Sequence, residues 1–317
     1  MEGNFYVLYK LMQTYSFSYR INHVHIVDKK DKEGITFMKT AIVTDSTAYI
    51  PKELRDKWNI HMIPLNVIFG NEVYQEEVNI SSTEFFEEVR NRELPTTSQP
   101  PVGQFVELFE RLGQEYDAVI SIHLSSGISG TYQGAVTAAG MVENVKVYPY
   151  DSEISCMVQG FYALEAAEWA DRGEEAEAII RRLDEMKQSV RAYFMVDDLS
   201  NLQRGGRLSS AQAFVGSLLK VKPLLHFVDK KIVPFEKIRT RKKAMKRIVD
   251  LLGEDATSGE EYKAVIIHAN REQEAIEWRK ELQAEYPNVE FLMGYFGAVI
   301  GTHLGEGAMG MGWVKKY

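Results

Sequence analysis

From Met38 onward, short apolar segments rich in β-branched residues alternate with amphipathic segments, and this alternation limits the fold more than any other feature. Strands that alternate with helices at this spacing are typical of a mainly parallel sheet covered on both faces. The first strands that the pattern predicts are 40–45, 61–69, 117–124 and 145–152. The helices predicted among them are 51–58, 81–92 (with a Ser/Thr cap), 100–116 and 129–142.

A second series follows two consecutive helical segments, 156–173 and 174–190. It predicts strands at 191–198, 263–270 and 288–297, a hairpin centred on Asp229-Lys230-Lys231 within 222–238, and a basic helix at 240–253. We therefore expect an α/β fold with two lobes, 38–152 and 153–317. The N-terminal lobe should contain a mainly parallel sheet and the C-terminal lobe a mixed sheet.

Residues 1–37 precede this pattern and differ from it. They contain neither a continuous apolar core nor a small-residue cleavage site, so they make a poor signal peptide. Lys32-Glu33-Gly34 can be encoded by a purine-rich run that resembles a bacterial ribosome-binding site, a few codons before Met38. We expect residues 1–37 to be an upstream extension outside the working protein. An arm that docks on the surface is the alternative.

Composition excludes several classes of protein. The formal net charge of −8 argues against a nucleic-acid partner, because such proteins usually present a basic face. The single cysteine, Cys156, excludes an internal disulfide and a cysteine-cluster metal site. The histidines lack ligand spacing, and no apolar run reaches the roughly 18–20 residues that span a bilayer. We expect a cytoplasmic protein with no metal, cofactor or stable membrane insertion.

The segment GTHLGEGAMG, residues 301–310, contains the glycine spacing of a dinucleotide-binding fingerprint. That fingerprint needs a following helix and an acidic residue about 20 positions further on. Only seven residues follow Gly310, so neither can exist. The dinucleotide interpretation therefore fails.

Two segments place clusters of hydroxyl groups just before predicted helices. LSSGISGTYQGA (124–135) contributes Ser125, Ser126 and Ser129, and LPTTSQPP (94–101) contributes Thr96, Thr97 and Ser98. Backbone N–H groups at a helix N-terminus favour an anion, and hydroxyls add donors. Helix capping alone explains one hydroxyl in each segment and not three.

Basic side chains gather in two further segments. Arg204 and Arg207 flank a glycine pair in LQRGGRLSS (202–210), where guanidinium groups on a tight turn suit phosphate or carboxylate recognition. Solvated arginines at the end of a helix are the alternative. TRKKAMKR (240–247) is a candidate partner surface, and a solvated basic face is the simpler interpretation.

The sequence contains no GxSxG elbow, phosphate-binding loop or HExxH motif. Asp45-Ser46 and Asp151-Ser152 end predicted strands and are candidates for a catalytic pair, although Asp and Ser at strand ends are usually turn formers. Together with His303 they define an alternative function, a hydrolase or phosphotransferase. The residues otherwise offer donors for an anion.

Taken together, these segments resemble the DegV family of bacterial lipid-binding proteins. The resemblance covers residues 38–317, in the family's order, and excludes 1–37. Its motifs are AIVTDSTAYIP (41–51), TSQPPVGQF (97–105), LSSGISGTY (124–132), LQRGGRLSS…FVGSLLKVKPLL (202–225), KIRTRKKAM (237–245) and GAVIGTHLGEGAMGMGW (297–313).

The resemblance implies a non-catalytic protein that buries a long-chain fatty acid and presents it to a separate fatty acid kinase subunit, which phosphorylates the carboxylate. It implies that Thr97 and Ser126 hold the carboxylate, with His303 nearby. The implied supporting residues are Ser98, Ser125 and Gly127, and the implied contacts to the acyl phosphate or kinase are Arg207 and Arg239.

One position departs from the family pattern. Glu306 stands where the GTHxGPG motif has proline. A carboxylate near a bound acid would oppose it electrostatically, unless the side chain points to solvent.

Overall fold

The computed structural model describes residues 38–197, 199–209, 222–257 and 259–317, and Met38–Tyr317 form one compact unit. Residues 1–37 lie outside the described residues, and so do residues 210–221 of the motif LQRGGRLSS…FVGSLLKVKPLL. None of the described helices is long and apolar enough to cross a membrane.

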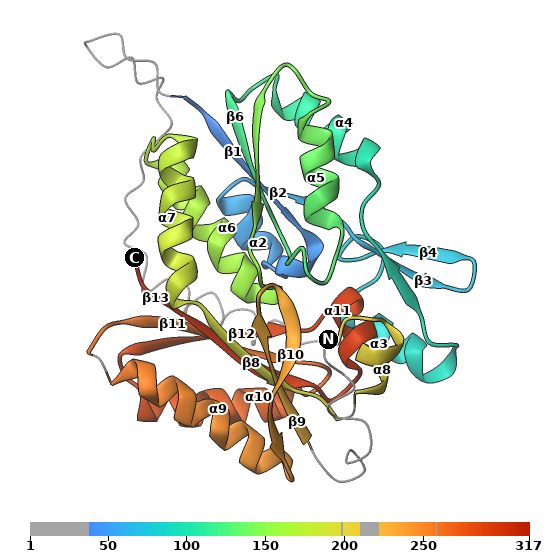
Figure 1. Cartoon of the computed structure of the whole chain (residues 1–317), viewed down its shortest axis with the longest axis vertical. Helices are drawn as coiled ribbons and strands as arrows, with labels where there is room; N and C mark the ends of the chain where they lie inside the picture. Colours follow the sequence, from blue (N-terminus) through green and yellow to red (C-terminus); the bar gives the residue numbers. More distant parts are fainter. Residues whose placement is uncertain (1–37, 198, 210–221, 258) are drawn as a thin grey trace, which may run out of the picture. The chain divides into compact units, whose positions relative to one another are not determined.

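The sheet of the N-terminal lobe is parallel, with the strand order β2-β1-β6-β7 (Figure 1). Its strands are β1 (Thr40–Asp45), β2 (Ile60–Ile63), β6 (Ala118–His123) and β7 (Lys146–Asp151). Alternate side chains of β1 face opposite ways: Ala41 and Val43 pack toward α4 (Val102–Leu112) and α5 (Thr131–Ala139), and Ile42 packs with α6 (Cys156–Asp171). The predicted parallel sheet with helices on both faces is confirmed.

The strand predicted at 61–69 is in fact two strands in different sheets. The chain turns at Pro64, which has no N–H to donate, and the Leu65 amide donates to the Ser46 hydroxyl (3.0 Å). Strand β3 (Asn66–Phe69) then joins a small antiparallel sheet with β4 (Glu72–Gln75) and β5 (Thr96–Ser98), in the order β4-β3-β5. The TSQP segment is therefore a strand, with Thr97 opposite Val67.

The C-terminal lobe contains a mixed sheet in the order β10-β9-β8-β13-β11-β12, as predicted. Its strands are β8 (Arg191–Met195), β9 (Lys222–Val228), β10 (Lys231–Ile238), β11 (Tyr262–His268), β12 (Val289–Tyr295) and β13 (Met309–Lys315). Strands β11 and β12 run parallel, and the other neighbouring strands of this described sheet run antiparallel. The predicted hairpin is confirmed: Asp229 and Lys230 adopt positive φ (46° and 71°) between β9 and β10.

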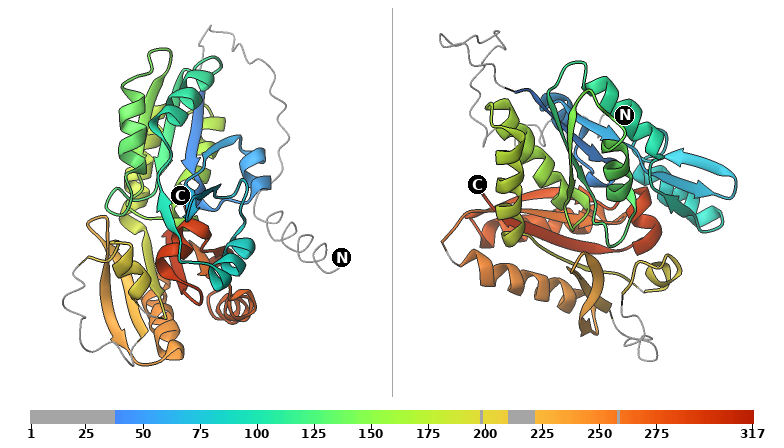
Figure 2. Two further views of the ribbon diagram at one scale, coloured as in Figure 1. Left: turned by 90° about the vertical axis from the view of Figure 1, so that its right-hand side faces the viewer. Right: turned by 45° about the horizontal axis from the view of Figure 1, so that its top comes forward.

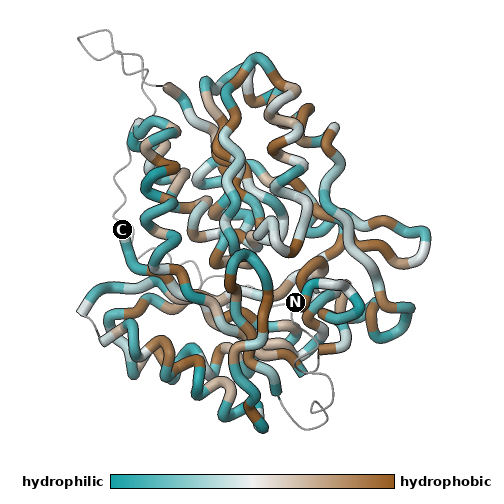
Figure 3. Tube along the Cα trace, viewed as in Figure 1, coloured by the Kyte–Doolittle hydropathy of each residue, from teal (hydrophilic) through white to brown (hydrophobic). Residues whose placement is uncertain are grey.

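Helices cover both faces of this second sheet (Figure 2). Helices α9 (Arg241–Ala256) and α10 (Glu272–Glu285) bury one face. The opposite face, including Ile267 and Phe194, packs into a large core shared with α6 and α7 (Ala176–Ser189). Hydrophobic residues concentrate in the strands, whereas the helices alternate in hydropathy (Figure 3). Because the two lobes share one core, the boundary at 152/153 stays a prediction.

Short helices complete the described chain. They are η1 (Ser46–Ala48), α2 (Lys52–Lys57), α3 (Ser82–Asn91), α8 (Ser200–Arg204) and α11 (Ala298–Leu304). The predicted Ser/Thr cap of α3 is confirmed at Ser81, and Glu84 completes a capping box with it. Helix α11 lies between the lobes beside α3 and α8 (Figure 1).

Sequence reasoning missed the central strand β13. It pairs with β8 on one side and β11 on the other, although it contains Gly310 and Gly312. Glycine is depleted in strands, so the segment gives no strand signal. Glycine in β13 allows close packing against α6, because a Cβ at Gly312 would lie 2.3 Å from Val158 of that helix.

The β9–β10 turn fastens the C-terminal lobe to the segment that precedes α5. The Ser125 hydroxyl donates to the Lys230 carbonyl oxygen (2.6 Å), and the Lys230 ammonium pairs with Asp151 (3.0 Å). Gly127 packs against the same carbonyl, since a Cβ there would lie 2.2 Å from it. We refer to Ser125, Gly127, Lys230 and Asp151 as the lobe clasp.

Replacing Gly127 with alanine should therefore weaken the lobe clasp. We expect Gly127→Ala to lower the free energy of unfolding by about 1–3 kcal/mol, because backbone must shift to admit the methyl group. Gly103→Ala is the matched control, since a Cβ at Gly103 in α4 meets no atom within 4 Å. Denaturant unfolding of the two variants measures the difference, and equal stability would contradict the packing role of Gly127.

Candidate functional site

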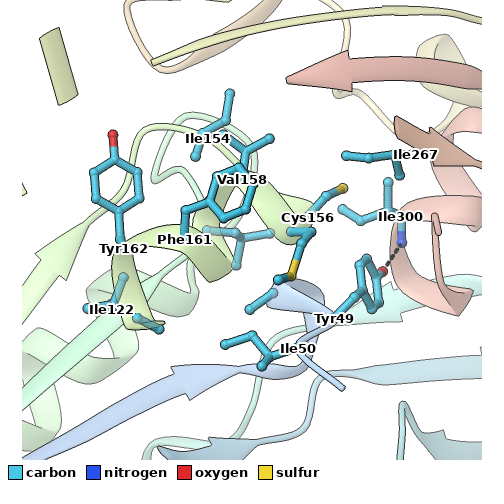
Figure 4. Close-up of a cluster of buried hydrophobic side chains, with 14 of the residues drawn as sticks. Tyr49, Ile50, Ile122, Ile154, Cys156, Val158, Phe161, Tyr162, Ile267 and Ile300 are labelled. Carbon is cyan, nitrogen blue, oxygen red and sulfur yellow. Dashed lines mark hydrogen bonds between the residues drawn. The ribbon is translucent and has the colours of Figure 1, made fainter. Parts of the chain in front are cut away.

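An apolar cavity lies between the two lobes, closed on one side by α11 and on another by β13. About 860 Å³ in and around it is not filled by protein atoms, part of it open to solvent. Its apolar wall includes Ile154, Val158, Phe194, Ile267, Val299 and Ile300. Figure 4 shows several of these side chains converging from α6, α11 and β11.

One end of the cavity is polar. The polar residues there come from β5 and the segment after it, from the segment before α5, from the turn at 205–207 after α8, and from α11. They are Thr97, Ser98, Gln99, Ser129, Arg207 and His303. The structure thus brings together Thr97 and Ser98, Arg207, and His303 from three segments that the sequence analysis singled out.

His303 forms a hydrogen bond to Thr97, with 2.9 Å between Nε2 and Oγ1. Burial, with Arg207 and Arg204 adding to it, lowers the pKa of His303 to about 4, so the ring is neutral near pH 7. Its Nδ1 is buried and has no hydrogen-bond partner among the described residues. An orphaned acceptor is less costly than an orphaned N–H, so we assign the proton to Nε2. The Thr97 hydroxyl then accepts from His303 and keeps its own proton for a ligand.

Arg207 contributes a fixed positive charge at the same end. Its Nε donates to the Ile128 carbonyl (3.1 Å) and one terminal nitrogen donates to the Gly205 carbonyl (2.5 Å). Among the described residues no acidic side chain forms an ion pair with it. The guanidinium is therefore held in place by neutral carbonyls, which leave its charge available to an anion.

Ser129, and not Ser126, reaches the cavity. The Ser129 hydroxyl lies 2.9 Å from the Thr131 hydroxyl at the start of α5 and lines the polar end. The Ser126 hydroxyl instead donates to Asp151 (2.5 Å), and Ser126 does not line the cavity. The neighbouring lobe clasp turns the Ser126 side chain toward Asp151, and the expected contact of Ser126 with a carboxylate stays a prediction.

Of the residues expected to support the carboxylate site, one lines the cavity and the others do not. Ser98 lines the cavity and accepts a hydrogen bond from the Asn66 amide (3.2 Å). Ser125 and Gly127 belong to the lobe clasp, so their contacts are structural. Arg239 is exposed after β10 and does not line the cavity.

Glu306 points away from the cavity. Its carboxylate receives two hydrogen bonds from Arg90 (2.5 and 3.2 Å) and one from Asn270 (2.8 Å). Arg90 lowers the pKa of Glu306, so this carboxylate is ionised and paired. The departure from the family's proline therefore adds a link to α3 and does not oppose an anion in the cavity.

The residues of the alternative catalytic site do not assemble. Asp45 and Ser46 are buried and do not line the cavity. Asp45 instead accepts from His123 (3.0 Å), whose other nitrogen lies 2.7 Å from the Ser121 hydroxyl. This Ser–His–Asp arrangement is fully buried, so a substrate cannot reach it. No group of three or more His, Cys, Asp or Glu in the described ranges could hold a metal ion.

A model of the DegV family matches residues 39–316. The chain belongs to the DegV family. It is 65% identical over 281 residues to protein DegV of Bacillus subtilis, a match that covers 88% of this chain and 100% of that protein. The resemblance drawn from the motifs is thereby confirmed.

Solved DegV structures share the fold. The crystal structure of DegV from Bacillus subtilis, described as a fatty acid binding protein, matches with a TM-score of 0.84 and 64% identity, covering 88% of this chain and 100% of that one. A fatty-acid-binding DegV family protein from Thermus thermophilus matches with a TM-score of 0.83 and 32% identity, covering the same shares. These relatives are described by binding and not by a catalytic activity.

Sequence reasoning missed Glu76, a buried carboxyl that anchors α11 to the N-terminal lobe. Glu76 accepts hydrogen bonds from the Ser46 hydroxyl (2.7 Å), the Tyr49 hydroxyl (2.9 Å) and the Val299 amide (2.7 Å). Figure 4 shows Tyr49 against Ile300, whose amide also reaches the Tyr49 hydroxyl. Burial raises the pKa of Glu76 from 4.5 to about 7.

This pKa predicts how stability depends on pH. Because the folded-state pKa is raised, the stabilisation is complete below the unfolded pKa of 4.5 and is lost as pH rises through about 7. In Glu76→Gln the amide N–H₂ takes the place of the protonated oxygen beside Ser46. Between about pH 5 and about pH 8, the wild type should lose on the order of 2–3 kcal/mol relative to Glu76→Gln.

Denaturant unfolding of both proteins across this pH range measures the difference. The comparison also removes the opposite contribution of His303, whose lowered pKa is common to both proteins. Glu87→Gln, at an exposed position of α3, is the control and should follow the wild type. Parallel pH profiles for the wild type and Glu76→Gln would contradict a buried titrating carboxyl.

Proposed function

We propose that this chain binds a long-chain fatty acid in the cavity between its lobes, and that it presents the carboxylate to a separate fatty acid kinase subunit. The observation that carries the proposal is the cavity's asymmetry. Its wall is mostly apolar, with Ser155 and Tyr193 as polar exceptions, and Thr97, Ser129, His303 and Arg207 converge at one end. A ligand that fits both parts has a long hydrocarbon chain and one anionic head.

Each polar residue has a distinct role in holding the carboxylate. The Thr97 hydroxyl donates one hydrogen bond, with its orientation set by His303. Ser129 donates a second, in place of the Ser126 first expected. Arg207 supplies the positive charge, since the imidazole is neutral. Hydrogen bonds to a charged group are worth about 1.5–3 kcal/mol each.

The apolar wall supplies most of the affinity. Burial of a hydrocarbon chain contributes about 0.8 kcal/mol per CH₂. A chain of about 16 carbons therefore contributes roughly ten kcal/mol before the entropy cost of binding. The polar end then selects for an acid and fixes its direction.

Presentation to a kinase follows from how the head is held. Thr97, Ser129 and Arg207 would hold the carboxylate by hydrogen bonds alone, so one of its oxygens keeps a lone pair with which it can attack a phosphoryl group. Arg239 is exposed on the turn between β10 and α9 and is proposed to contact the kinase or the acyl phosphate. The basic face of α9 adds less: Lys246 pairs with Asp250 and Arg247 with Glu236. The hydrolase or phosphotransferase alternative has no comparable support.

The first test identifies the ligand and the serine. Organic extraction of the denatured protein followed by mass spectrometry should yield a long-chain fatty acid near one per chain. After delipidation, Ser129→Ala should weaken binding by about tenfold or more, the effect of one hydrogen bond to a carboxylate. Ser126→Ala is the matched control and should bind nearly as the wild type does. Weak binding by Ser126→Ala alone would overturn the assignment to Ser129.

The proposed presentation of the acid to a kinase subunit needs a separate test. The loaded chain, mixed with ATP and a fatty acid kinase subunit, should give acyl phosphate, whereas the chain with ATP alone should give none. Arg239→Ala should lower the rate in the mixture and leave the affinity for the acid unchanged. Acyl phosphate formed by the isolated chain would refute the division of labour.

A further inference from the structure

A second cavity adjoins the first, away from the carboxylate end. Ile154, Ala192, Tyr193 and Phe227 line both cavities, whereas the residues of the polar end line only the first. Because the two cavities share these walls, at most one layer of side chains separates them. The acyl cavity therefore has a neighbouring space at the end where the ligand's tail would lie.

The second cavity contains an unsatisfied buried hydroxyl. Tyr162 of α6 is 0% exposed and lines this cavity, yet its hydroxyl has no hydrogen-bond partner among the described residues. Figure 4 shows the hydroxyl directed away from Ile122. A buried hydroxyl without a partner is costly, so such groups usually have a reason to persist. A ligand oxygen would remove the cost.

Three of the charged side chains around this cavity are already paired. Glu153 pairs with Lys187 (3.3 Å) and Lys230 (3.7 Å), and Lys230 also pairs with Asp151. Burial lowers the pKa of His226, so its imidazole is neutral near pH 7. Tyr162 and His226 are uncharged, whereas the Arg191 guanidinium donates to the Gln188 and Val190 carbonyls. The unpartnered Tyr162 hydroxyl would find a partner in a hydroxyl or keto oxygen of a ligand.

We propose that the second cavity receives the distal end of an oxygenated acyl chain, with the Tyr162 hydroxyl bound to a neutral oxygen at or near that end. The inference rests on the proposed function, because it requires the carboxylate to be held at Thr97. The ligand class is thereby extended from plain fatty acids to hydroxy and keto fatty acids. Ala192, the smallest of the four shared residues, is the point at which the chain passes.

The test compares two ligand series on two proteins. Calorimetry on the delipidated wild type and Tyr162→Phe would use plain acids and ω-hydroxy acids from lauric to stearic length, and the α,ω-dicarboxylic acids of equal length. Tyr162→Phe removes only an unpartnered hydroxyl, so it should fold and bind plain acids as the wild type does. For the ω-hydroxy acid that fits best, the variant should lose roughly fivefold to tenfold in affinity, one hydrogen bond's worth.

A second variant tests the path independently. Ala192→Leu should weaken the longer ω-hydroxy acids and leave lauric acid unaffected, because the added side chain narrows the passage. Tighter binding of the dicarboxylic acids than of the matching ω-hydroxy acids to the wild type would overturn the assignment of a neutral oxygen to Tyr162.

The outcomes separate the two proposals. If plain acids bind but every ω-hydroxy acid responds equally in the wild type and Tyr162→Phe, the hydroxyl serves a bound water and the inference is overturned. If no plain acid binds either protein, the proposed function itself has failed.

Discussion

Helix α11 is held between the lobes, and the candidate site depends on this attachment. The buried carboxyl of Glu76 accepts the Val299 amide at one end of the helix, and Thr97 bonds His303 near the other. The helix thereby closes the apolar cavity with Val299 and Ile300 and positions the imidazole at its polar end. Neither bond joins residues near in sequence, so the site exists only once both lobes have formed.

The neighbouring serines of LSSGISG show how one motif serves two purposes. Ser125, Ser126 and Gly127 contact Lys230 and Asp151, which holds the C-terminal lobe against α5. Ser129 alone faces the cavity. The clasp fixes the backbone just before Ser129, so the structural contacts orient the binding residue. A substitution at Ser126 should therefore affect the contact with Asp151, whereas a substitution at Ser129 should affect ligand binding directly.

Much of the fold could be predicted from local pattern. The parallel N-terminal sheet, the mixed C-terminal sheet, the cap at Ser81 and the turn at Asp229-Lys230 all follow from periodicity and turn chemistry. Strand β13 could not, because its place at the centre of the sheet comes from tertiary packing around Gly312 and not from strand propensity. Glu76 was missed for a similar reason: nothing in its neighbourhood in the sequence indicates burial. Which serine reaches the cavity depends on side-chain direction, which spacing does not encode.

A crystal structure of the chain with a fatty acid carrying bromine at its terminal carbon tests the central claim most directly. The anomalous signal locates the tail, and the density locates the head. The account predicts the carboxylate within hydrogen-bond distance of Thr97 and Ser129 and the bromine deep in the apolar cavity. A reversed ligand, or one bound outside the cavity with Ser126 on its carboxylate, would contradict it.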